Sequence, residues 1–128
     1  MPHLTVEYSG NLERETNLTA LCHALHGCMV ASGLFELGAI RVRARPCANY
    51  AVADLLPQNA FADIILRIGQ GRSEADRKAI GAALMAEAEA HFAPQLAHPH
   101  FALSLEVQEI SASFSWKTNA IHSRLRTR

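Results

Sequence analysis

The sequence has no long apolar run and no excess of charge of one sign. No stretch approaches the roughly 20 apolar residues of a membrane-spanning helix, and the N-terminus lacks the basic segment and apolar core of a secretion signal. Lysine and arginine together number 12, as do aspartate and glutamate, so no overall field attracts the chain to nucleic acid or to an anionic membrane. We therefore expect neither partner, and a cytoplasmic location.

Cysteine is also scarce. The three cysteines, Cys22, Cys28 and Cys47, are an odd number without the spacing of a disulfide scaffold. This usage is typical of reduced thiols in a reducing compartment. A chain of 128 residues has the length of one ordinary domain, so residues 1–128 are expected to form a single domain with its own core.

Hydrophobic periodicity predicts four strands and two helices. Period-2 alternation predicts strands over residues 3–8, 40–45, 60–69 and 102–110. Helical spacing predicts one helix between the N-cap Asn17 and the stop Gly33, and another from a capping box at Ser73 to Phe92, with Pro94 just beyond it. A helical crossover makes the strands within each unit parallel. The predicted fold class is α+β: a duplicated βαβ fold with a four-stranded mixed sheet and two helices on one face.

Two helices can cover only one face of such a sheet. Sheets with parallel pairing seldom leave a face in water, so self-association is the expected remedy, and a solvated polar face is the alternative. The uncovered face would carry residues of mixed charge: Thr5, Glu7, Arg41, Arg43, Arg45, Asp63, Arg67, Ser104, Glu106 and Gln108.

Pro2 is unusual because it follows Met1 directly and begins an alternating run. A small second residue allows an aminopeptidase to remove Met1, which leaves a free secondary amine at the start of a strand. Arg41 lies on the strand expected to pair there, and a nearby cation lowers the pKa of such an amine towards neutrality, where it is suited to general-base catalysis. Alternatively, Pro2 simply begins an edge strand, and Arg41 pairs across strands with Glu7 or Glu106.

The segment IGQGRS joins a strand to a helix through two glycines, with Arg72 just before the cap Ser73. A helix N-terminus offers free N–H groups to anions, and the arginine fork suits a carboxylate. The segment therefore predicts a carboxylate site, although a plain strand-to-helix turn is also consistent with it. It is not a dinucleotide fingerprint, because the third glycine is missing.

Two other segments carry weaker signals. In CHALHGC, Cys22 and His26 have i, i+4 spacing and His23 and His26 have i, i+3 spacing. These spacings suit zinc, but no second ligand pair follows, and Cys22 belongs to the apolar stripe. The basic segment WKTNAIHSRLRTR is expected to be a solvated tail or a subunit contact, because the protein as a whole is neutral. Contact with RNA, or a contribution of Lys117 to a site, is the alternative.

Several of these segments together resemble one known family. MPHLTVE, GAIRVRA, LRIGQGRS, LSLEVQEI and FSWKTNAIH occur in this order over nearly the whole chain. They resemble the 5-carboxymethyl-2-hydroxymuconate isomerase family of the tautomerase superfamily, whose fold is also that of 4-oxalocrotonate tautomerase and macrophage migration inhibitory factor. The resemblance implies a homotrimer without cofactor or metal that acts as an isomerase in homoprotocatechuate degradation.

The resemblance also assigns roles to individual residues. It implies that processed Pro2 is the catalytic base and that Arg41 and Arg72 bind the substrate, a small unsaturated acid with several carboxylates. Relatives that decarboxylate or dehalogenate leave the exact substrate open. A non-catalytic module that binds a dicarboxylate or a protein on the same fold is the alternative.

Overall fold

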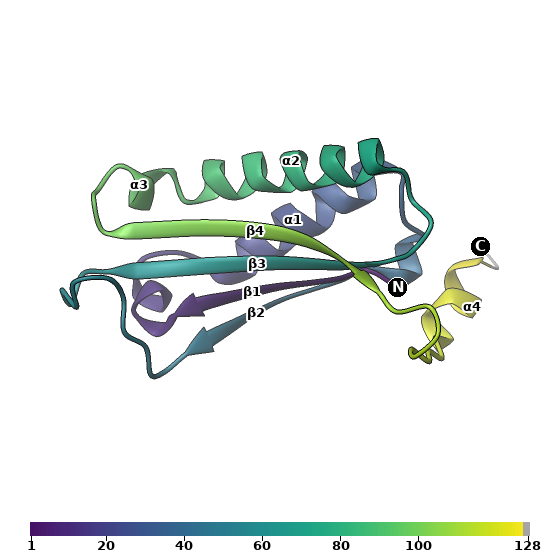
Figure 1. Ribbon diagram of the computed structural model, residues 1–128, viewed down its shortest axis with the longest axis horizontal. Coiled ribbons are helices and arrows are strands. Elements are labelled where there is room, and N and C mark those ends of the chain that lie inside the picture. The colour runs from purple at the N-terminus through teal and green to yellow at the C-terminus, as the bar shows by residue number, and fades with distance from the viewer. Residues whose placement is uncertain (127–128) are drawn as a thin grey trace.

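The computed structural model describes residues 1–126, in which two long helices pack on one face of a four-stranded sheet (Figure 1). This arrangement confirms the predicted α+β class and the repeated strand–helix–strand order. The six main elements are β1 (His3–Ser9), α1 (Leu18–Ser32), β2 (Arg41–Cys47), β3 (Ala60–Gly69), α2 (Glu74–His91) and β4 (Phe101–Ile110).

The sheet has the strand order β2-β1-β3-β4. Strands β1 and β2 are parallel, as are β3 and β4, whereas the central pair β1 and β3 is antiparallel. The predicted mixed sheet is therefore confirmed. This topology places the starts of β1 and β2 beside the ends of β3 and β4, so residues distant in sequence meet at one end of the sheet.

The core lies between the sheet and the two helices. Inward-facing strand residues such as Leu4 and Leu66 are fully buried, as are Leu25 of α1 and Leu84 of α2. Fully burying a side chain of this size stabilises the fold by about 1.5–3 kcal/mol.

The predicted helix boundaries are confirmed by their capping contacts. The Asn17 side chain accepts a hydrogen bond from the Ala20 amide, and the Ser73 hydroxyl accepts one from the Asp76 amide, each at 3.0 Å. Gly33 ends α1 with a φ of 70°, a conformation that glycine adopts without steric cost.

Four short helices lie outside the prediction: η1 (Gly10–Arg14), η2 (Leu37–Ala39), α3 (Ala93–Leu96) and α4 (Ala120–Arg126). Pro94 does not simply follow a helix end, because it lies in the first turn of α3, where its missing N–H has no helical partner to lose. The C-terminal segment is not merely solvated, since α4 folds back onto η2. No helix of residues 1–126 is both long and apolar enough to cross a bilayer.

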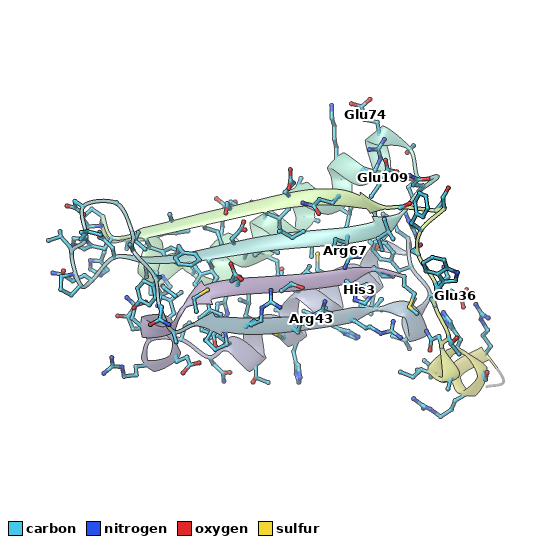
Figure 2. All side chains as sticks on the ribbon, turned by 60° about the horizontal axis from the view of Figure 1, so that its bottom comes forward. His3, Glu36, Arg43, Arg67, Glu74 and Glu109 are labelled. Atoms are coloured by element: carbon cyan, nitrogen blue, oxygen red, sulfur yellow. The ribbon has the colours of Figure 1, made fainter. Side chains whose placement is uncertain are left out.

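The second face of the sheet is left uncovered, as predicted, and its charges are arranged in rows (Figure 2). The row nearest the N-terminus is basic, because strand pairing aligns Arg41, His3 and Arg67. Four residues further along β1, the row across the sheet contains Glu7 and Asp63 with Arg45. The open face is therefore basic at the Pro2 end and more acidic towards the other end.

Candidate active site

Pro2 lies at the end of the sheet where the four strands bring distant residues together. It is buried, and its carbonyl accepts a hydrogen bond from the Arg41 amide at 3.3 Å. This contact fixes Pro2 beside the first residue of β2, so the predicted proximity of Pro2 and Arg41 is confirmed. The Pro2 nitrogen is joined to Met1 by a trans peptide bond.

Two cavities adjoin at this end of the sheet. The first, of about 610 Å³, is lined by Pro2, Phe35 and Arg72 and by residues of α4. The second, of about 650 Å³, opens on the uncovered face and is lined by Arg41 and Arg67. Met1 and Lys117 line both cavities. The N-terminal residue therefore stands between the two arginines that the sequence singled out.

Arg41 is held by backbone contacts rather than by an acidic partner. Its Nη1 donates to the Ala39 carbonyl at 2.7 Å. The two carboxylates considered as alternatives have other contacts: Glu7 pairs with Arg45 at 3.6 Å, and Glu106 accepts from Gln108 at 2.8 Å. An arginine has five N–H donors, so most of the Arg41 guanidinium remains available to a ligand.

Arg72 is positioned by the loop that follows α1. Its Nη2 donates to the Leu34 carbonyl at 2.9 Å and its Nη1 to the Gly69 carbonyl at 3.3 Å. The guanidinium also lies 4.7 Å from the centre of the Phe35 ring, a stacking contact that favours one orientation of the planar group. Arg72 is thus oriented in advance and retains N–H groups that can bind a carboxylate.

The surroundings of the N-terminus disfavour a positive charge. Burial lowers the pKa of the Met1 amine from its ordinary value, and the positive charges of Lys117, Arg72 and Arg41 lower it further. Both effects follow from the cost of adding a cation to a partly dehydrated, basic environment. The same environment attracts anions.

Helix α4 forms one wall of the first cavity. The hydrophobic periodicity of the sequence did not predict this helix. Asn119 donates from its side-chain nitrogen to the Gly38 carbonyl at 2.9 Å, which ties α4 to η2. Arg126 forms two hydrogen bonds with Glu36, at 2.6 and 2.7 Å, and these hold the pKa of the Glu36 carboxyl below its ordinary value. The sequence feature that indicates this helix is Asn119, whose side chain caps α4 by accepting a hydrogen bond from the Ile121 amide.

We expect Gly38→Ala to displace α4 from this wall. A β-carbon at residue 38 would lie 2.9 Å from the His122 Nδ1 atom and 3.3 Å from its backbone. Overpacking costs about 1–3 kcal/mol, so amide exchange in α4 should accelerate by about 5- to 150-fold. Gly27→Ala is the control, because a β-carbon at residue 27 meets nothing within 4 Å. Equal exchange in the two variants would contradict the contact.

The segment CHALHGC, whose spacing suits zinc, lies on α1. Cys22 and Cys28 are half-buried, and burial raises the pKa of both thiols. Among residues 1–126, no three histidine, cysteine or acidic side chains are grouped as metal ligands. Cys28 packs against the hydrophobic core as a small apolar residue.

Comparison with known proteins places the chain in a family. Residues 2–125 match the family model described as 5-carboxymethyl-2-hydroxymuconate isomerase. The 5-carboxymethyl-2-hydroxymuconate Delta-isomerase of Escherichia coli is 32% identical over 123 residues, which cover 96% of this chain and 98% of that protein. A 5-carboxymethyl-2-hydroxymuconate isomerase structure from Deinococcus radiodurans R1 is 42% identical, with a TM-score of 0.92 over 98% of this chain and 94% of that one.

The fold extends to more distant proteins. A fused 4-OT, described as a symmetric trimer, has a TM-score of 0.64 at 15% identity, over 91% of this chain and 93% of that one. This likeness concerns the fold alone. The family match, by contrast, spans nearly the whole chain, including Pro2 and the strand that begins at Arg41. The chain therefore belongs to the 5-carboxymethyl-2-hydroxymuconate isomerase family and is an enzyme of the isomerase class.

Proposed function

We propose that this chain, after removal of Met1, isomerises 5-carboxymethyl-2-hydroxymuconate or a similar unsaturated enol-acid during homoprotocatechuate degradation. The Pro2 amine acts as the general base. The observation that carries the proposal is the placement of the N-terminus between Arg41 and Arg72, at the junction of two cavities. Removal of Met1 would join these cavities and expose the Pro2 amine at their junction.

The environment of the N-terminus suits a base that works near neutral pH. Burial and three neighbouring cations lower the pKa of the Met1 amine, and the Pro2 amine would occupy nearly the same place. A lowered pKa keeps the amine neutral and able to accept a proton. A proline amine also lacks free rotation about its N–Cα bond, so its lone pair has a fixed direction.

In the proposed reaction the amine accepts a proton at one end of the conjugated hydroxy-diene and returns it to a carbon at another. No electrons are lost or gained, and the product is a conjugated ketone with the same atoms. Arg41 and Arg72 bind carboxylates in the two cavities and stabilise the dienolate charge that develops as the proton leaves. Holding both ends of the substrate also places the diene beside the base.

The direct test is turnover of 5-carboxymethyl-2-hydroxymuconate by protein whose intact mass shows that Met1 is absent. Ketone formation is followed by the change in ultraviolet absorbance. Arg72→Ala should reduce kcat/KM by about 10- to 100-fold, the effect of one lost charged hydrogen bond, while Arg72→Lys should restore part of it. Fully processed wild-type protein without turnover of this or related enol-acids would refute the assignment.

We also propose that the chain forms a homotrimer through its uncovered sheet face. The basic row around His3 and the more acidic row around Glu7 lie at opposite ends of this face, so a repeated contact between unlike ends pairs opposite charges. Burial, together with Arg43, Arg67 and Arg41, lowers the pKa of His3. A solved protein of the same fold is a symmetric trimer, and a ring of heterologous contacts closes without free faces.

Charge reversal on the open face should weaken this trimer. We expect Arg43→Glu to shift the light-scattering mass at micromolar concentration from three chains towards one, because the Arg43 Nη1 atom lies 3.2 Å from the His3 Nδ1 atom and its charge belongs to the basic end of the face. Lys78→Glu is the control, because Lys78 lies on the solvent side of α2 and contacts only Glu74, at 3.3 Å, among the described ion pairs. A monomeric wild-type protein with full activity would contradict the trimer.

A further inference from the structure

Lys117 is a third cation at the Pro2 site, on a segment outside the sheet and the two long helices. It follows β4 and precedes α4, in the part of the chain that Figure 1 shows beside the N-terminus. It lines both cavities, whereas Arg41 lines only the second and Arg72 only the first. Its position at the junction differs from that of either arginine.

Lys117 also has the strongest electrostatic effect of the three cations on the N-terminus. Its charge lowers the pKa of the Met1 amine more than that of Arg72 or Arg41. Between Met1 and Arg126, no acidic side chain forms an ion pair with Lys117. Glu36, an acid that lines the first cavity, is instead hydrogen-bonded to Arg126. A ligand carboxylate would therefore meet an ammonium group without a competing partner.

We propose that Lys117 determines specificity by binding the carboxymethyl branch of the substrate. This inference rests on the proposed function of the same site. The two arginines are assigned to the carboxylates at the ends of the six-carbon chain, because they lie in separate cavities on either side of the N-terminus. The third carboxylate, on the branch, then meets the cation at the junction. An ammonium on a flexible stem suits a single carboxylate at a branch point.

The inference is tested by comparing substrates that differ only in the branch. Both substrates are compared at a pH at which the Pro2 amine is neutral in both proteins, because the Lys117 charge also lowers the pKa at the N-terminus. For Lys117→Met, kcat/KM with 5-carboxymethyl-2-hydroxymuconate should then fall by about 10- to 100-fold, while kcat/KM with 2-hydroxymuconate should change less than about threefold. Lys117→Arg should restore most of the preference, because it restores the positive charge. Lys78→Met is the matched control and should leave both values unchanged, since the Lys78 side chain is exposed on the solvent side of α2.

Binding measurements separate this inference from the proposed reaction. By calorimetry with Met1-free protein, Lys117→Met should weaken binding of propane-1,2,3-tricarboxylate by at least about tenfold and leave binding of glutarate nearly unchanged. If wild-type protein lacks turnover, the proposed reaction is refuted, and the binding measurements alone decide the role of Lys117. The inference would be overturned if Lys117→Met lowered kcat/KM equally for both substrates and the affinity equally for both ligands, or if it lowered neither quantity.

Discussion

Protein that retains Met1 should have a kcat/KM about 10²- to 10⁴-fold below that of Met1-free protein, the usual contribution of a general base. In the retained form the Pro2 nitrogen belongs to an amide and cannot accept a proton. Met1 also occupies the junction between the two cavities. The two forms are distinguished by intact mass and assayed with 5-carboxymethyl-2-hydroxymuconate under the same conditions.

A variant and a pH profile separate loss of the base from blockage of the cavity. Pro2→Ala leaves the cavity open but replaces the rigid secondary amine, and it should also lose most of the activity without unfolding. In wild-type protein, kcat/KM should rise with pH as the amine loses its proton, with an apparent pKa below the ordinary α-amino value of about 8, because burial and the neighbouring cations lower the pKa at this position. Full activity with Met1 present, or an apparent pKa above that value, would exclude Pro2 as the base.

Phe92→Ala should lower the free energy of unfolding by about 3–5 kcal/mol. Phe92 is fully buried at the end of α2. Its ring centre lies 4.8 Å from that of Phe101, the first residue of β4, and 5.0 Å from that of His91. The side chain thus joins the second long helix to the edge strand, and its removal leaves a cavity that rigid strands cannot close. Urea denaturation at fixed protein concentration measures the change.

Phe114→Ala is the matched control for this substitution. Phe114 is 81% exposed, so the same change of side chain should alter the free energy of unfolding by less than about 0.5 kcal/mol in the isolated subunit. If Phe92→Ala lowered the free energy of unfolding no more than Phe114→Ala does, Phe92 would not belong to the core. If the effect of Phe114→Ala alone depended on protein concentration, a partner subunit would cover Phe114.

The main elements were predictable because their signals are local. Alternating residues such as Leu4 and Val6 indicate a strand with one buried face, and side-chain caps such as Asn17 and Ser73 mark helix starts without reference to the rest of the chain. The repeated strand–helix–strand order then restricts each unit to parallel pairing. From these rules alone, Pro2 and Arg41 are expected to be neighbours, as the structure shows.

The remainder of the site depends on contacts between distant parts of the chain. The seven residues of α4 are too few to form a stable isolated helix, and the helix is held by contacts such as that of Asn119 with Gly38, 81 positions away. Arg72 reaches the site because its guanidinium binds the Leu34 carbonyl across 38 positions. Local periodicity carries no information on such contacts. Only the tertiary structure, by packing the loop after α1 and the segment before α4 around the N-terminus, placed Arg72 and Lys117 beside Pro2.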